Sequence, residues 1–177
     1  MSPSNAIDRL GSSRGLAARK LGNGMIRNDQ VFVLFPIVAG LIAALCTTLI
    51  HSIALWASVN LFRRERKLGL VGSGLWADLG IFALAMSFAF AAHLTEIALW
   101  AVLFLICGQF TSFELAYYYS AGNYTTLGSG NLIMRSPWKL LGPLEAADGA
   151  LMFGVSTAMV FAIAQRLMRA KFSDLEG

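Results

Sequence analysis

The stretch at 124–131, which reads YTTLGSGN, places two glycines, two threonines and a serine together in a chain otherwise rich in leucine, alanine and phenylalanine. Such a cluster favours a loop over a helix or a strand. Lipid offers no hydrogen bonds to the amides and carbonyls of a loop, so non-helical backbone at membrane depth must be buried in protein or line a water-filled cavity. The octapeptide therefore predicts an interior aqueous path.

A second chemical feature is the set of ionisable side chains inside apolar segments, His51, His93 and Glu96. Ionisable groups within a membrane are costly and count as functional candidates. His93 and Glu96 are three residues apart and share one face of a helix. These donors could bind a metal, but without a second carboxylate or histidine pair they make a poor transition-metal site. We expect a neutral or hydrogen-bonded pair near the membrane surface and no bound metal.

The composition places these residues in an integral membrane protein. Of 177 residues, 56% are hydrophobic and only 14% are charged, against about 25% charged residues in an ordinary soluble domain. The net charge of +4 comes from basic clusters at the edges of apolar blocks, as membrane orientation and lipid head groups favour. Nucleic acid is not an expected partner. Cys46 and Cys107 lie in apolar segments and suggest no disulfide framework.

Three apolar blocks are long enough to cross a bilayer, for which roughly 20 residues suffice. We expect a flexible basic tail at 1–30, a first transmembrane helix at 31–62, a basic cytoplasmic loop at 63–74 and a second, outer helix at 75–108. An inner helix follows at 143–170, with Pro143 in its first turn, and a C-terminal tail at 171–177. Small residues on this inner helix, including Gly149 and Gly154, suit either close helix packing or a pore-lining or hinge role.

Carboxylates and tryptophans at the block edges suggest positions at the membrane surface. Glu145 and Asp148 open the last helix, where negative charge complements the helix dipole, and we expect both at the surface. The four tryptophans could serve as interfacial anchors; they are Trp56, Trp76, Trp100 and Trp138.

A short helix precedes the polar octapeptide. Thr111 and Glu114 have the spacing of a capping box, and Gly122 with Asn123 provides a C-terminal stop. A helix of about 11 residues is near 16 Å long at 1.5 Å per residue, roughly half the bilayer core, so it cannot cross. Its partly negative C-terminal end favours a cation in the path beyond.

The segments HLTEIALWA (93–101), FELAYYYS (113–120), YTTLGSGN (124–131) and LLGPLEAADG (140–149) together resemble the potassium-channel pore-loop family, in particular small bacterial ion-channel proteins. The resemblance covers roughly residues 40–168. It implies an all-α integral membrane protein with three transmembrane helices plus a re-entrant pore helix and filter loop at 111–131. In that family the filter carbonyl oxygens replace the hydration shell of K⁺.

The resemblance assigns an ion-binding filter at five positions: Thr126, Leu127, Gly128, Ser129 and Gly130. Glycine at 128 and 130 permits the positive backbone angles that turn successive carbonyls the same way. One filter segment cannot surround an ion, so four chains must meet on an axis as a homotetramer.

The residues expected to support the pore are Tyr124, Thr125, Asn131 and Glu114. Two positions depart from the family pattern. Ser129 stands where the family has a tyrosine that packs behind the filter, and Asn131 stands where it has an aspartate at the outer mouth. The first change removes support for the filter diameter, and the second lowers the local concentration of cations.

We therefore expect a passive, multi-pass cation channel of a bacterial inner membrane, with K⁺ as the permeant ion and no cofactor. Its partners would be the lipid bilayer and further copies of the chain. One alternative is a non-conducting, channel-like subunit of a larger membrane complex; another is a membrane metalloenzyme built on His51, His93 and Glu96. There is no paired Ser/His/Asp set or phosphate loop, so we expect no enzymatic activity.

The orientation expected from the family puts the pore loop and the N-terminus outside and the basic run RRERK (63–67) in the cytoplasm. Counted over the whole chain, Lys and Arg are then equally divided between the two sides. A physiological start at Met25 would restore the cytoplasmic excess that short loops normally show.

Overall fold

The computed structural model describes the backbone of residues 4–71, 73–128 and 130–173, and side chains over 34–71, 73–128 and 130–169. Four α-helices and one short 3₁₀ helix follow each other along the chain: α1 (Ser4–Lys67), α2 (Leu75–Ile106), α3 (Phe113–Tyr124), η1 (Trp138–Leu140) and α4 (Leu141–Ser173). The described residues contain no strand. The all-α expectation is therefore confirmed.

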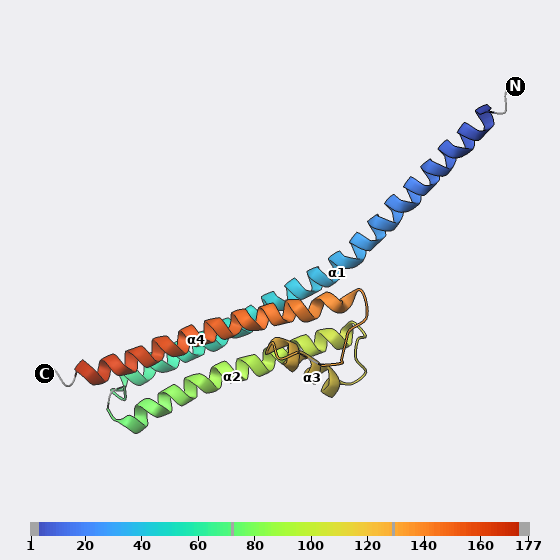
Figure 1. Cartoon of the computed structure of the whole chain (residues 1–177). Helices are drawn as coiled ribbons and strands as arrows, with labels where there is room; N and C mark the ends of the chain where they lie inside the picture. Colours follow the sequence, from blue (N-terminus) through green and yellow to red (C-terminus); the bar gives the residue numbers. More distant parts are fainter. Residues whose placement is uncertain (1–3, 72, 129, 174–177) are drawn as a thin grey trace.

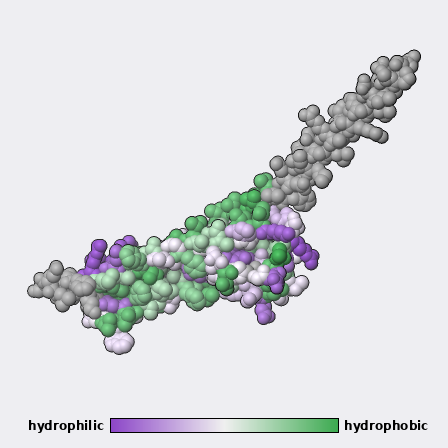
Figure 2. Space-filling view, viewed as in Figure 1, coloured by the Kyte–Doolittle hydropathy of each residue, from purple (hydrophilic) through white to green (hydrophobic). Residues whose placement is uncertain are grey.

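Three helical stretches are long and apolar enough to cross a membrane, namely Leu34–Lys67, Leu75–Ile106 and Trp138–Arg169. The three lie side by side along most of their length (Figure 1). Figure 2 shows a mainly hydrophobic surface over the body of this bundle and hydrophilic residues at its two ends. Such a surface suits a lipid environment, as the expected membrane class requires.

The short helix α3 does not run the length of the bundle. It lies beside the second half of α2 and the first half of α4, at the end from which α1 projects (Figure 1). Its 12 residues are about 18 Å long at 1.5 Å per residue, well short of a bilayer core of about 30 Å. A half-length helix between two full-length ones is the arrangement that the sequence predicts.

Two hydrophobic clusters hold the ends of the bundle. The cluster at the α3 end includes Trp100, Phe104, Tyr119, Tyr124 and Leu141, so it joins α2, α3 and α4. The cluster at the opposite end contains Phe62, Ile81, Ala85, Ile163 and Leu167 and joins α1, α2 and α4. At the α3 end, α1 and α4 approach closely at Gly40, where an added Cβ would lie 2.8 Å from a methyl group of Leu144.

The N-terminal region and the basic run differ from expectation. Residues 4–30, expected to be a flexible tail, are helical and continuous with the first span, and RRERK at 63–67 continues the same helix instead of beginning a loop. Helix propagation costs little once a long helix exists. Arg, Glu and Lys are good helix formers, and cations suit a helix C-terminus. The loop itself is confined to 68–74.

The ends of α3 are each displaced from their expected positions. Ser112, not Thr111, is the N-cap, and its hydroxyl oxygen accepts from the backbone N–H of Leu115 at 3.3 Å. Both residue types suit an N-cap, and the structure uses the later one. At its other end α3 passes through the expected stop and continues to Tyr124.

Candidate functional site

The loop after α3 turns sharply out of the helix. The Thr126 N–H donates to Asn123 O at 2.8 Å and the Gly128 N–H donates to Gly122 O at 2.9 Å, so the last carbonyls of the helix are satisfied. Positive φ values follow at Thr126 (60°), Gly128 (87°) and Gly130 (62°). The expected need for glycine at 128 and 130 is thus borne out by the backbone. Thr126 adopts a backbone conformation that residues other than glycine rarely take.

The residues of the octapeptide divide between the bundle interior and the surface. Tyr124 is fully buried, whereas Thr125, Thr126, Gly128, Gly130 and Asn131 are exposed and Leu127 is 86% exposed. Ser129 lies outside the described residues.

Glu114 lies apart from the loop. It occupies the first turn of α3 and is exposed, so its charge complements the N-terminal end of that helix. The structure does not bring it to the filter positions.

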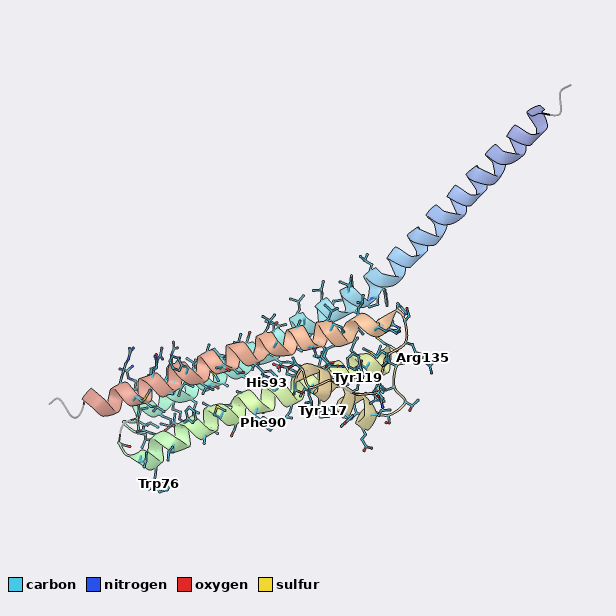
Figure 3. All side chains as sticks on the ribbon, in the orientation of Figure 1. Trp76, Phe90, His93, Tyr117, Tyr119 and Arg135 are labelled. Atoms are coloured by element: carbon cyan, nitrogen blue, oxygen red, sulfur yellow. The ribbon has the colours of Figure 1, made fainter. Side chains whose placement is uncertain are left out.

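The ionisable residues His51, His93 and Glu96 come together inside the bundle. Nδ1 of His51 lies 2.9 Å from Oε1 of Glu96, and Nδ1 of His93 lies 3.3 Å from Oε2. All three side chains are buried, and Figure 3 places His93 midway along the bundle, away from the ends marked by Trp76 and Arg135. The expected hydrogen-bonded pair is therefore a buried cluster of three, not a pair near the membrane surface.

Tyr124 and Ser156 complete this buried cluster. The Tyr124 hydroxyl donates to Oε2 of Glu96 and lies 3.0 Å from Nδ1 of His93. The Ser156 oxygen lies 2.9 Å from Nε2 of both His51 and His93. Burial raises the pKa of the Tyr124 phenol, and its hydrogen bond to Glu96 raises it further, so the phenol keeps its proton and acts as the donor. We call these five residues the buried polar cluster.

Comparison with known protein families places an ion-channel segment over this architecture. Residues 88–166 match a family model described as "Ion channel". This part of the chain is similar to ion-channel domains. The match covers most of α2 and α4 with α3 and the loop between them, and it supports an ion-channel function in a membrane. No curated protein and no solved structure matches the chain.

Within the matched residues, the positions of Glu145 and Asp148 correct the expectation of surface charges. Glu145 is fully buried and Asp148 is 5% exposed. The Ser120 hydroxyl donates to Oε1 of Glu145, and Oε2 of Glu145 has no hydrogen-bond partner in the described part of the chain. Oδ2 of Asp148 accepts from Thr47 at 2.8 Å and from Trp100 at 2.9 Å. Trp100 is consequently an interior residue and not an interfacial anchor.

Glu145 and Asp148 are buried because α4 starts earlier than expected. The helix begins at Leu141, so both carboxylates lie beyond its first turn and on the face that meets α2 and α3. The buried residues on this face recur at helical spacing: Glu145, Asp148, Met152 and Ser156. The participation of Ser156 was not anticipated, since one serine in an apolar helix is unremarkable without its neighbours.

Glycines of α4 serve packing where the described side chains meet them. A Cβ added at Gly149 would lie 2.1 Å from the carbonyl oxygen of Tyr124, whereas one added at Gly154 would meet nothing within 4 Å. The close-packing alternative therefore holds at Gly149, where the backbone of α4 touches the end of α3.

Proposed function

We propose that this chain is the pore-forming subunit of a passive cation channel in a bacterial inner membrane, with K⁺ as the permeant ion. The filter would comprise Thr126 to Gly130, whose carbonyl oxygens take the place of water around the ion. No cofactor and no enzymatic step are part of this proposal.

One observation carries the proposal: a half-length helix inside the segment similar to ion-channel domains ends in a loop with positive φ at two glycines. The C-terminal end of α3 carries partial negative charge, which favours a cation beyond it. Tyr124 holds this C-terminal end in place, because its hydroxyl donates to Glu96 and its backbone packs against Gly149. A loop fixed so firmly at its start is suited to holding oxygen atoms in place around an ion.

The proposed assembly is a homotetramer. A single loop presents oxygen atoms to one side of an ion only, so four copies are needed to surround it. The exposed apolar side chains at the loop end, Leu127 at 86% and Ile133 at 76% exposed, would be covered by neighbouring subunits. Such burial stabilises an assembly by about 25 cal/mol for each Å² of apolar surface removed from water.

Two residues in the filter region affect selectivity, and they are also compatible with a second function, that of a non-conducting subunit. Serine at 129 and asparagine at 131 provide neither an aromatic ring behind the filter nor a negative charge at its mouth. They favour weaker preference for K⁺ over Na⁺, and in the extreme a non-conducting subunit of a larger membrane complex.

Ion flux through the purified chain in liposomes tests the proposal. We expect K⁺ efflux from the wild type and its loss in Gly128→Ala, because a Cβ at a φ of 87° costs roughly 1–2 kcal/mol in each subunit. Gly80→Ala is the matched control, since Gly80 is an ordinary helical glycine with no neighbour within 4 Å of its added Cβ, and it should conduct like the wild type.

Two results would contradict the proposal. Flux that survives Gly128→Ala at the wild-type rate would mean that the filter lies elsewhere. A folded tetrameric wild type without any flux of K⁺ or Na⁺ would favour the non-conducting subunit.

A further inference from the structure

We propose that the buried polar cluster is a metal site, in which His51, His93 and Glu96 bind a divalent transition-metal ion such as Zn²⁺. The three residues come from α1 and α2, two helices that are separate spans of the membrane. The site lies in the bundle interior beside the end of α3 and is distinct from the exposed loop proposed to conduct ions.

The donor atoms converge as a metal requires. One ligand atom from each of the three residues lies within 4.8 Å of the others, and all three side chains are buried. Two imidazoles and one carboxylate are the set used by open zinc sites, in which a fourth position is left for water or another oxygen. The Tyr124 hydroxyl, 3.0 Å from Nδ1 of His93, is an oxygen that the same cluster brings close to the ligands.

The surrounding hydrogen bonds hold the ligands as the outer shell of a metal site does. When the two Nδ1 atoms face a metal, each neutral imidazole carries its proton on Nε2. Both Nε2 atoms lie 2.9 Å from the Ser156 oxygen, which has two lone pairs and can accept from both. Tyr124 in turn donates to Oε2 of Glu96 and fixes the carboxylate. Such outer partners orient metal ligands and strengthen binding.

Without a metal, the same contacts form a hydrogen-bonded cluster. The Ser156 oxygen lies 2.9 Å from both Nε2 atoms, and the Tyr124 hydroxyl lies 3.0 Å from Nδ1 of His93.

The charge of the interior also calls for a cation. Among the described residues, the buried ionisable groups include the carboxylates of Glu96, Glu145 and Asp148 but no lysine or arginine. A buried carboxylate without a positive partner is strongly unfavourable, and a divalent ion between the histidines and Glu96 would supply positive charge beside the Glu96 carboxylate.

Binding would join three elements at one point. The ion would link α1 to α2 directly and α3 through Tyr124, which immediately precedes the loop at 125–131. The site is therefore a structural one, whose occupancy fixes the start of that loop. The proposal of this metal site does not depend on whether the protein conducts ions.

Metal content of the full chain tests this inference. The protein is purified in detergent through a tag without histidine, incubated with Zn²⁺, freed of loosely bound ions, and analysed by mass spectrometry of the elements. We expect about one Zn²⁺ per chain in the wild type. His51→Gln, His93→Gln and Glu96→Gln should each weaken binding by at least about tenfold, and Ser156→Ala by about 10–100-fold.

A control variant removes the thiols, which are the other common zinc ligands. Cys46 and Cys107 are free, and Cys46→Ser with Cys107→Ser should retain the wild-type Zn²⁺ content. Co²⁺ offers a second readout, because visible absorption bands of a four-coordinate site should appear in this control and be absent in His93→Gln.

Helix content by circular dichroism and the elution position in gel filtration identify the variants that fold. Folded wild type that takes up no Zn²⁺ would overturn the inference, and hydrogen bonds alone would then hold the cluster. Equal Zn²⁺ content in the wild type and in the folded ligand variants would overturn it as well. Neither outcome depends on ion flux.

Discussion

Asp148 shows how a single side chain can connect distant parts of the chain. Its Oδ2 accepts hydrogen bonds from Thr47 on α1 and Trp100 on α2, at 2.8 and 2.9 Å, while its backbone belongs to α4. In hydrocarbon surroundings these donors have no water to replace them, so the three helices are held at one point by polar contacts and not by apolar packing alone.

Trp100→Phe should therefore destabilise the protein despite conserving an aromatic ring. The variant leaves a buried carboxylate with one donor fewer, at a cost of about 1–3 kcal/mol, and should lower the midpoint of thermal unfolding in detergent. Trp56→Phe is the matched control, since Trp56 is 69% exposed and an exposed ring should contribute within about 0.5 kcal/mol. Equal midpoints for the two variants would contradict the importance of the Asp148 contact.

The residues show what could and could not be inferred from the sequence. Residue type and spacing were sufficient to place His93 and Glu96 on one helix face and to require positive φ at Gly128 and Gly130, because these follow from local geometry. The burial of Glu145 and Asp148 could not be inferred, because it depends on where α4 begins and on which neighbours its face meets. The role of Ser156 depends on two histidines that are distant in sequence.

Among the helices, α2 begins where expected, at Leu75, but ends at Ile106, before the expected bound at 108. Gly108, with a φ of 65°, follows the helix end in the conformation that glycine takes most readily. At the start of α3 two adjacent residues could cap, and at its end Thr126 takes the positive φ that a glycine would usually provide. Tertiary packing decides such cases, since local preferences differ by only about 1 kcal/mol.

The close contact between α4 and the end of α3 can be tested by substitution. In Gly149→Ala the new Cβ would lie 2.1 Å from the Tyr124 carbonyl oxygen, so the helices must separate, at a cost of about 1–3 kcal/mol typical of overpacking. We expect a lower thermal midpoint in detergent and, because Tyr124 borders the loop, reduced flux.

Gly154→Ala on the same helix is the control for this test. Its Cβ would meet nothing within 4 Å, and alanine is the better helix former by about 1 kcal/mol. The midpoint should stay or rise. A Gly149→Ala protein as stable as Gly154→Ala would show that the two elements do not pack as described.

The whole molecule has two chemically distinct ends. At one end the C-terminal part of α1 meets that of α4, where the Arg166 guanidinium lies 5.9 Å from the Phe62 ring centroid. At the other end lie α3, the loop and Arg135, which Figure 3 shows opposite Trp76. The three-span fold thus brings RRERK at 63–67 and the end of the last span to the same side, as the sequence predicts, because two antiparallel crossings separate them.

The orientation of these two ends in the membrane is the last prediction. Four basic residues in the five at 63–67 meet Arg166 at one end, and short loops rich in Lys and Arg remain in the cytoplasm. We therefore expect this end inside and Lys139, at the loop end, outside. In a background with Cys46 and Cys107 replaced, Lys139→Cys should react in intact cells with a maleimide that cannot cross membranes, while Arg64→Cys, also an exposed position, should react only after permeabilisation. Labelling of Arg64→Cys in intact cells with protection of Lys139→Cys would invert the topology, and would place the candidate filter on the cytoplasmic side.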